Sequence, residues 1–358
     1  MKSSTLSAFA ADFRNHFDGV LAEHLEKTIA QMADVDSSGA AVAHVISDFV
    51  TNGGKRLRPL LVAIGYNAFS DRDWREVVQA GIATELFHAF FLIHDDLMDR
   101  SDLRRGAPTV HRVFAKTLQT SSVRRESNAE HIANSMAILA GDLCCALAYN
   151  ALLTVPFPAD RILRALQHMQ RMVHATTIGQ VLDIAPPNET SETLVTKIHL
   201  LKTAKYSVEA PLHLGMILAD ASSDELAAMS SFALPGGLAY QIKDDLLGVF
   251  GTEEEVGKPI TSDLQEGKET LLTVFTRAHG NEAQRSRLYK LHGKADLTEA
   301  ELAEARAMFN ACGAVKFSED RALRLVAEGK AALKKMSIPS SSRRILGELA
   351  DYVIGRKA

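Results

Sequence analysis

Three aspartates followed by two arginines are the residues of this sequence best suited to carry out chemistry. Asp95, Asp96 and Asp99 come at the end of an apolar, helix-forming stretch, and Arg104 and Arg105 follow them. Positions four apart share one face of a helix, so Asp95 and Asp99 should repel each other unless a cation lies between them. Carboxylate oxygens suit Mg²⁺, and guanidinium groups suit phosphate. The spacing therefore predicts a metal-diphosphate site, and a solvated acidic helix end is the plainer alternative.

A second acidic pair, Asp244 and Asp245, lies much further along the chain and also follows an apolar helical stretch. If the two helix ends face each other, their carboxylates form one cluster that can hold several magnesium ions. Basic groups accompany both pairs: Lys55 with Arg58, Arg104 with Arg105, Lys202, Lys258 and Lys268. This is more positive charge than one carboxylate cluster needs, and it is enough for two diphosphate groups.

A glycine-rich basic loop, residues 53–59, precedes another predicted helix. Its paired glycines free the backbone, and the proline at its end suits the first turn of a helix. The three cations of this loop are either an anion site at the helix start or ordinary charged residues between two helices. His88 lies two turns before Asp95 on the same helical face, where it is either a ligand-binding residue or a core histidine.

The elements that must position these residues are helices throughout. Apolar residues at helical spacing predict helices over residues 5–33, 40–50, 132–153, 160–184 and 224–250. We expect the last helix to be interrupted or kinked at Pro235-Gly236-Gly237. Alternating β-branched runs with hairpin turns are nearly absent, and no repeat of fixed period is found. The sequence thus predicts an all-α fold, a single large helical bundle over residues 1–358, with about a dozen helices and a central cavity.

Polar residues at and inside these helices carry further predictions. Asp71 or Asp73 is expected to cap the long helix that leads to the first acidic motif. Asp183 and Lys202 lie in mostly apolar surroundings, so each needs a polar or charged partner.

Composition and charge exclude several classes of protein. The formal net charge of -4 argues against a protein that binds nucleic acid through general positive charge. The three cysteines, Cys144, Cys145 and Cys312, lack metal-ligand spacing and suit a reducing, cytoplasmic location. Charged residues interrupt the first apolar run, so we expect no secretory signal. No uninterrupted apolar run reaches about 18 residues, so we expect no transmembrane segment.

Taken together, the motifs resemble those of the trans-isoprenyl diphosphate synthases, the polyprenyl synthetase family. The matching residues, in the family order, are Gly53-Gly54-Lys55-Arg56-Leu57-Arg58-Pro59, His88, Asp95-Asp96-Leu97-Met98-Asp99, Arg104-Arg105-Gly106, Gly179-Gln180, Asp183, Lys202-Thr203, Gln241, Asp244-Asp245, Lys258 and Lys268. The resemblance implies the isoprenoid synthase fold, a homodimer, and three magnesium ions in each active site. It also implies condensation of isopentenyl diphosphate with allylic diphosphates.

The resemblance also implies a role for each matching residue. The diphosphate of isopentenyl diphosphate would be bound by Lys55, Arg58, His88 and Arg105. Magnesium would be bound by Asp95, Asp96, Asp99, Asp244 and Asp245. The allylic diphosphate would be held by Arg104, Lys202 and Lys258, and Lys268 would be a further substrate-binding residue. Side chains close to the developing carbocation would be Thr203 and Gln241, which with Lys202 and Arg104 make up the expected catalytic set.

Product length is expected to depend on Phe90 and Phe91, one turn before Asp95. In the resembled family these positions form a floor under the growing prenyl tail. Two aromatic rings there imply a short product, C15 farnesyl or C20 geranylgeranyl diphosphate. The plainer alternative is that both rings simply pack in the core.

One position departs from the family pattern, because Gly248 stands where many members have a third aspartate in the second motif. This puts a metal role at residue 248 in doubt, and Asp263 is a candidate for a nearby carboxylate. The basic C-terminal pair Arg356 and Lys357 is expected to close over the second diphosphate.

Three other functions stay open from the sequence. A class I terpene cyclase would also use an aspartate-rich helix and magnesium, but it has no need for a second diphosphate site. The others are a catalytic subunit of a longer-chain synthase and a non-catalytic regulatory subunit.

Overall fold

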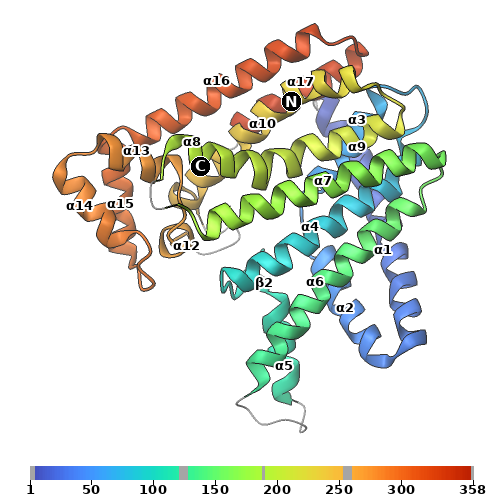
Figure 1. Ribbon diagram of the computed structural model, residues 1–358, viewed down its shortest axis with the longest axis horizontal. Helices are drawn as coiled ribbons and strands as arrows, with labels where there is room; N and C mark the ends of the chain where they lie inside the picture. The colour runs from blue at the N-terminus through green and yellow to red at the C-terminus, as the bar shows by residue number, and fades with distance from the viewer. Residues whose placement is uncertain (1–4, 121–127, 188–189, 253–259, 356–358) are drawn as a thin grey trace. The chain divides into compact units, whose positions relative to one another are not determined.

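The computed structural model describes residues 5–120, 128–187, 190–252 and 260–355, and helices make up most of them (Figure 1). The helices are α1 Thr5–Val35, α2 Ser37–Thr51, α3 Leu57–Asn67, η1 Trp74–Val77, α4 Val78–Met98, α5 Val110–Thr120, α6 Ala129–Leu153, α7 Ala159–Ile184, α8 Glu192–Ile198, η3 His199–Glu209, α9 Ala210–Leu218, α10 Ser223–Phe250, α12 Ser262–Gln265, α13 Leu271–His279, α14 Glu282–Leu291, α15 Glu299–Ala311, α16 Ala314–Lys335 and α17 Ser340–Gly355. The all-α prediction is confirmed.

The chain divides into two compact units, each made of separate stretches of sequence. Unit 1 is mainly Ser7–Ala63 with Asp71–Leu166, and unit 2 is mainly Ile64–Ser70 with Gln167–Ala358. The first acidic motif belongs to unit 1 and the second to unit 2. A single domain over residues 1–358 and a central cavity therefore stay predictions, and each unit is described by itself.

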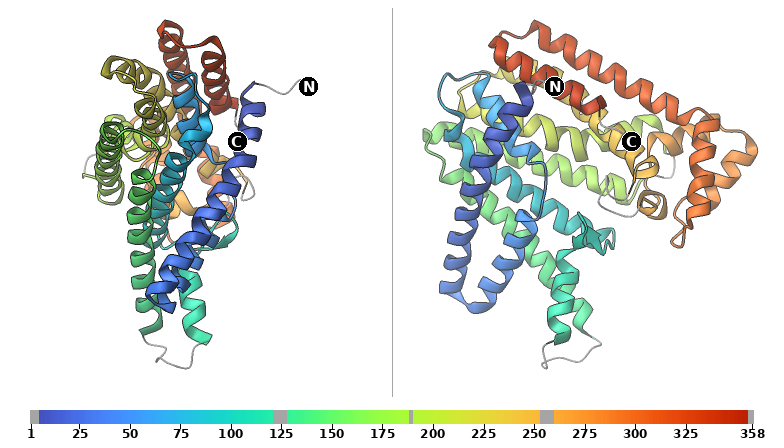
Figure 2. Two further views of the ribbon diagram at one scale, coloured as in Figure 1. Left: turned by 90° about the vertical axis from the view of Figure 1, so that its right-hand side faces the viewer. Right: turned by 180° about the vertical axis from the view of Figure 1, so that it is seen from behind.

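Unit 1 is organised around the packing of α4 on α6, which run side by side (Figure 1). Gly141 on α6 makes the close approach possible, because a Cβ there would overlap the His94 imidazole of α4. His94 Nε2 lies 3.1 Å from the carbonyl oxygen of Ile138, and Phe87 meets Tyr149 edge-on with ring centroids 5.0 Å apart. α1 and α2 form an antiparallel pair beside this core (Figure 2). The result is a rigid base for the end of α4.

Unit 2 is organised around α10, which packs against α16 and against η3. Pro235 does not interrupt α10, because it lies inside a continuous helix, and the alternative of a kink at this position stays a prediction. Gly237 serves close packing instead, since a Cβ there would lie 2.6 Å from the Cα of Ala204 on η3. A glycine at this position lets two backbones touch.

A two-stranded hairpin was not expected from the sequence. β1 (Leu103–Arg104) pairs with β2 (Ala107–Pro108) in antiparallel register, Arg104 opposite Ala107. The two residues of the turn, Arg105 and Gly106, have φ values of 53° and 75°. Positive φ at both positions is the geometry of tight hairpin turns, in which glycine is favoured. The arginine pair is therefore held on a defined turn.

Local capping signals were partly correct. Asp73 caps the turn η1, where its carboxylate accepts a hydrogen bond of 3.0 Å from the backbone N–H of Arg75. η1 leads directly into α4. Asp73 therefore caps the short turn before α4 and does not cap α4 itself.

Two helical stretches, Trp74–Met98 and Ala129–Leu153, are long and apolar enough to cross a membrane by length and composition. Their apolar windows are 67% and 44% buried within the protein. Core helices of globular proteins pass the same test, so the absence of a transmembrane segment stays a prediction.

Candidate active site

The first acidic motif separates its aspartates into two kinds. Asp95 and Asp99 are half-buried near the end of α4, whereas Asp96 is buried. Arg104 contacts one oxygen of Asp96, with Nε at 2.6 Å and Nη2 at 2.5 Å, and its Nη2 lies 3.7 Å from Asp95. Burial raises the pKa of the Asp96 carboxyl to about 6, against the opposing effect of Arg104. Asp96 thus positions Arg104 beside the two more open carboxylates, and its own metal role stays a prediction.

Arg105 lies flat against the glycine pair of the basic loop. A Cβ added to Gly54 would lie 3.2 Å from Nη1 of Arg105, and Gly54 has a φ of +100°. Arg105 Nη1 also donates to the carbonyl oxygen of Asn52 at 3.3 Å. Only glycine allows both this backbone conformation and this close approach.

Arg105 also approaches His88, with Nη2 and Nε2 3.5 Å apart. Burial lowers the pKa of His88 well below its usual range, and the charges of Arg58, Arg105, Arg104 and Arg56 lower it further. The imidazole is therefore neutral among several guanidinium groups. This collection of cations is ready to accept an anion.

Arg56, the middle cation of the basic loop, has a structural place. Its Nη1 lies 2.7 Å from Glu85, and the two side chains are only 5% and 6% exposed. It also donates to Asp18 at 3.0 Å and to the carbonyl oxygen of Val50 at 2.8 Å. These bonds fix the loop in its left-handed turn, where Arg56 has a φ of 50°. The predicted anion-binding role of Lys55 and Arg58 stays a prediction.

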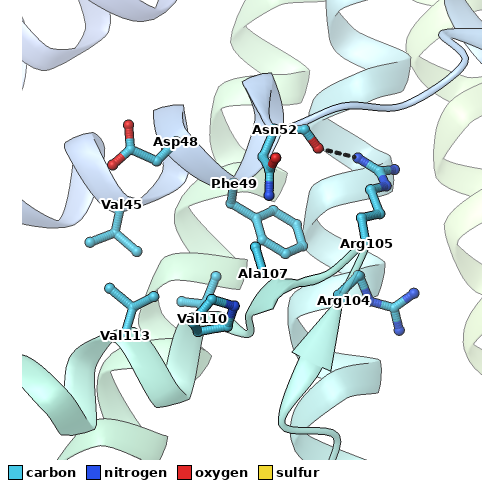
Figure 3. A pocket seen from close by; sticks show the side chains of 10 residues that line it. Val45, Asp48, Phe49, Asn52, Arg104, Arg105, Ala107, Val110 and Val113 are labelled. Atoms are coloured by element: carbon cyan, nitrogen blue, oxygen red, sulfur yellow. Dashed lines mark hydrogen bonds between the residues drawn. The ribbon is translucent and has the colours of Figure 1, made fainter. Parts of the chain in front are cut away.

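A pocket of ≈ 140 Å³ lies between α2, the hairpin and α5 (Figure 3). Its walls are largely apolar, with Val45 and Phe49 on one side and Val110 and Val113 on the other. Figure 3 shows the Arg104 guanidinium directed away from these side chains. The pocket is therefore not where Arg104 would meet a diphosphate.

Phe90 and Phe91 contact each other, with ring centroids 4.7 Å apart. Phe90 also packs against His94 at 5.0 Å, and His94 is the residue that faces α6. Phe91 lies four residues before Asp95 and so shares its side of α4. Helical spacing thus puts Phe91 on the side of Asp95, and the contact with His94 puts Phe90 on the side that faces α6.

In unit 2, Lys202 finds its partner in Asp183, whose Oδ2 lies 2.6 Å from the lysine Nζ. The prediction that both residues need partners is confirmed. Gly179 brings α7 against η3, because a Cβ there would lie 2.6 Å from the backbone nitrogen of Lys202. The glycine and the aspartate on α7 together position Lys202.

Lys202 and Thr203 lie in a π-helix, η3, whose hydrogen-bond pattern often marks functional sites. Thr203 Oγ1 donates to Gln241 Oε1 at 2.7 Å, and Gln241 Nε2 donates to Asp245 Oδ1 at 2.7 Å. His199 Nε2 lies 3.0 Å from the other oxygen of Asp245. This partly buried chain joins η3 to α10. His199 was not predicted from the sequence. The only signal for it is that a polar residue stands there between apolar neighbours.

The second acidic motif repeats the arrangement of the first. Asp244 is half-buried and Asp245 is buried. Gly248, four residues after Asp244, lies against Asp263, since a Cβ there would overlap the carboxylate oxygen Oδ2. Lys268 forms an ion pair with Glu266 at 2.6 Å.

Some predicted residues lie outside the described part of the chain. These are Lys258, Arg356 and Lys357. Among the residues that are described, no group of three or more His, Cys, Asp or Glu side chains is arranged to hold a metal by itself. Mg²⁺ is usually bound by one or two carboxylates together with substrate phosphates, so this arrangement fits such a site.

Comparisons with known proteins agree with this geometry. The polyprenyl synthetase family model matches residues 40–309. A short chain isoprenyl diphosphate synthase of Methanocaldococcus jannaschii is 31% identical, over 81% of this chain and 81% of that protein. A geranylgeranyl diphosphate synthase of Sulfolobus acidocaldarius is 32% identical, over 86% of this chain and 88% of that protein.

A solved structure is similar over nearly the whole chain. It is a geranylgeranyl pyrophosphate synthase of Corynebacterium glutamicum, complexed with isoprenyl diphosphate and magnesium. The TM-score is 0.88 and the identity 31%, over 95% of this chain and 99% of that one. The predicted isoprenoid synthase fold and the predicted class of enzyme, a short-chain prenyltransferase, are confirmed. The chain belongs to the polyprenyl synthetase family.

Proposed function

We propose that this chain is a magnesium-dependent enzyme that condenses isopentenyl diphosphate head-to-tail with allylic diphosphates, giving C15 farnesyl or C20 geranylgeranyl diphosphate. The observation that carries the proposal is the end of α4, where half-buried Asp95 and Asp99 lie beside an Arg104 held by Asp96. Carboxylates for a divalent cation and a guanidinium for phosphate thus stand together. The similar enzyme of C. glutamicum was solved with isoprenyl diphosphate and magnesium.

The homoallylic diphosphate is assigned to the cation cluster of the basic loop. Arg105 is held between Gly54 and His88, and the pKa of Arg105 is lowered by burial and by its neighbouring arginines, although Glu85 opposes them. Such mutual repulsion is relieved when a diphosphate enters. Lys55, Arg58, His88 and Arg105 are the proposed contacts.

The metal ligands are proposed to be Asp95, Asp99 and Asp244, with the buried Asp96 and Asp245 behind them. The buried oxygen Oδ2 of Asp96 lacks a hydrogen-bond partner among the described residues, which fits a site that takes up further positive charge. Three magnesium ions in this site would draw electron density onto the leaving diphosphate. Arg104, Lys202, Lys258 and Lys268 would hold that diphosphate from the protein side.

The protein's own part in the reaction is to bind, orient and stabilise charge. Lys202 is held by Asp183, and its fixed ammonium is proposed to face the departing diphosphate. Thr203 and Gln241 hold each other at 2.7 Å, and their oxygens are proposed to lie near the developing allylic cation. Preorganised groups of this kind lower the barrier because they need not reorient during the reaction. The proton lost at the end is assigned to the departed diphosphate.

The chain length and the assembly are further parts of the proposal. Phe91, on the Asp95 side of α4, is the proposed floor that limits the product. The protein is proposed to be cytoplasmic and to act as a homodimer. Light scattering on the purified protein tests the dimeric state directly.

One assay tests the proposed reaction. The purified protein is given isopentenyl diphosphate, magnesium and, in turn, dimethylallyl, geranyl or farnesyl diphosphate, and the products are separated by chromatography. We expect C15 or C20 diphosphates, and no product after chelation of the metal. Cyclic hydrocarbons made without isopentenyl diphosphate would identify a terpene cyclase instead. Products longer than C20 would identify a longer-chain synthase.

A further inference from the structure

We propose that Asp263 supplies the third carboxylate of the second acidic motif, at the place that Gly248 leaves open, and that it binds the divalent cation together with Asp244. This inference rests on the proposed function, because it adds a ligand to the magnesium site of that function.

The position of Asp263 relative to Gly248 carries the inference. A Cβ built on Gly248 would overlap Oδ2 of Asp263 and would lie 3.1 Å from its Cγ and 3.9 Å from its Cβ. The Asp263 carboxylate therefore occupies the space where a side chain of residue 248 would begin. Any residue other than glycine at position 248 would displace this carboxylate.

The space that the Asp263 carboxylate fills has a defined position relative to Asp244 on α10. Gly248 follows Asp244 by four residues, so the space above its Cα lies on the same helix face as Asp244. In the first motif the same spacing joins Asp95 to Asp99. The second motif thus has its two carboxylates on one face as well, although one of them comes from a different segment of the chain. Two carboxylates on one side of a helix suit Mg²⁺.

Both segments that bring Asp263 to Gly248 are firmly anchored. Arg306 fixes the end of α10, with Nε donating to the carbonyl oxygen of Val249 at 2.5 Å. Asp263 lies on the short helix α12, and its own carbonyl oxygen accepts from the backbone N–H of Lys268 at 3.0 Å. Next to it, Leu264 is buried and its carbonyl oxygen accepts from Gly293 at 2.7 Å. Asp263 is thus presented from a fixed backbone, as a metal ligand should be.

Three variants and a matched control separate a ligand from a merely structural aspartate. Asp263→Asn keeps the shape and removes the charge, and Gly248→Ala displaces the carboxylate. The double variant Gly248→Asp with Asp263→Ala moves the carboxylate onto α10, into the space that Asp263 vacates. Gly236→Ala is the control, since it lies on the same helix and a Cβ there meets no atom within 4 Å.

The readout is the affinity for Mn²⁺ in the presence of inorganic diphosphate, measured by electron paramagnetic resonance, with Mg²⁺ as competitor. We expect Asp263→Asn and Gly248→Ala each to weaken binding by about 10–100-fold, the usual effect of losing a group that supports a metal site. Gly236→Ala should bind as the unchanged protein does. The double variant should recover most of the lost affinity, which a purely structural role for Asp263 would not allow.

Unchanged Mn²⁺ affinity in Asp263→Asn would overturn the inference, and so would a double variant weaker than either single one. Thermal unfolding of each variant shows whether it is folded. If the Gly248 variants do not fold, Asp263→Asn still tests the inference. Prenyl transfer by the unchanged protein together with normal binding in Asp263→Asn would refute only this inference. Binding that depends on Asp263, in a protein without prenyl transfer, would refute the proposed function instead.

Discussion

The two acidic motifs follow one plan and differ in what supports it. In each, the first aspartate is half-buried and the second is buried and bonded to other side chains. Asp96 is held by Arg104 on strand β1 of the hairpin, whereas Asp245 accepts a hydrogen bond from Gln241 on its own helix and lies 3.0 Å from His199 on η3. In each pair of adjacent aspartates, one carboxylate is thus half-buried and the other is bonded within the protein.

The difference in support has a consequence for function. The partner of Asp96 is a cation that lies 3.7 Å from Asp95, so the buried aspartate of the first motif directly places the guanidinium that we propose to bind phosphate. The partner of Asp245 is an amide that is bonded to Thr203. The second motif is therefore tied to the residues proposed to lie near the carbocation, and the first to those proposed to hold the diphosphate.

The largest effect is expected from the half-buried aspartates. Asp95→Asn and Asp244→Asn should each lower kcat/KM by about 10²–10³-fold, the loss typical of removing one preorganised electrostatic contact. Steady-state kinetics with geranyl and isopentenyl diphosphate measure this, together with chelation of the metal, which should abolish turnover in all variants. If the losses of kcat/KM in Asp95→Asn and Asp244→Asn agree within about tenfold, the two motifs contribute equally to the reaction.

A nearby carboxylate provides the control for this first prediction. Asp102 is exposed and bonds to Arg112 at 2.6 Å, away from Asp95. Asp102→Asn should leave kcat/KM within about twofold, because exposed ion pairs contribute little. A loss in Asp102→Asn as large as that in Asp95→Asn would mean that charge in general, and no specific ligand, is responsible.

A smaller and unequal effect is expected from the buried aspartates. Asp96→Asn breaks a charge-assisted contact worth about 1.5–3 kcal/mol, so kcat/KM should fall by about 10–100-fold. Asp245→Asn keeps an oxygen that can accept from Gln241, and a neutral bond worth about 0.5–1.5 kcal/mol implies a loss of about tenfold or less. The same kinetic assay, with thermal unfolding alongside, distinguishes these outcomes.

A double variant sharpens the contrast. If Asp96 acts by holding Arg104, then Asp96→Asn combined with Arg104→Gln should lose little more than Arg104→Gln alone. Independent, additive losses in this pair would contradict the assigned role. Equal losses in Asp96→Asn and Asp245→Asn would remove the proposed difference between the motifs.

The sequence predicted the local features of this site well. The helices around Asp95 and Asp244 follow from apolar spacing, and the need of Asp183 and Lys202 for partners follows from their apolar neighbours. Such features depend on residues within a few turns of one another, so a single sequence contains them.

Features that depend on distant segments could not be predicted. The inward turn of Asp96 depends on a hairpin whose strands are only two residues long, too short to leave an alternating pattern. His199 lies in a π-helix, where five-residue hydrogen bonding shifts the faces that ordinary helical spacing predicts. The approach of Asp263 to Gly248 depends on how α12 packs beside α10.

Removing the ring of Phe90 or Phe91 is expected to change the reaction rate least. These two variants are the most informative about the chain length of the product. Phe91→Ala should lengthen the product, because Phe91 shares its side of α4 with Asp95. Phe90→Ala should leave the product unchanged and lower stability by at most about 3 kcal/mol, because its ring packs on His94 toward α6. Chromatography of the chain lengths and thermal unfolding measure the two effects separately.

Phe90→Ala is the matched control for Phe91→Ala, since both variants remove one ring from the same turn of the same helix. If both lengthen the product, the floor is made by the stacked pair, whose ring centroids lie 4.7 Å apart, and the separation of their faces has no consequence. If neither does, product length is set elsewhere than on α4. Only a change confined to Phe91→Ala ties chain length to the same helix face that carries Asp95 and Asp99.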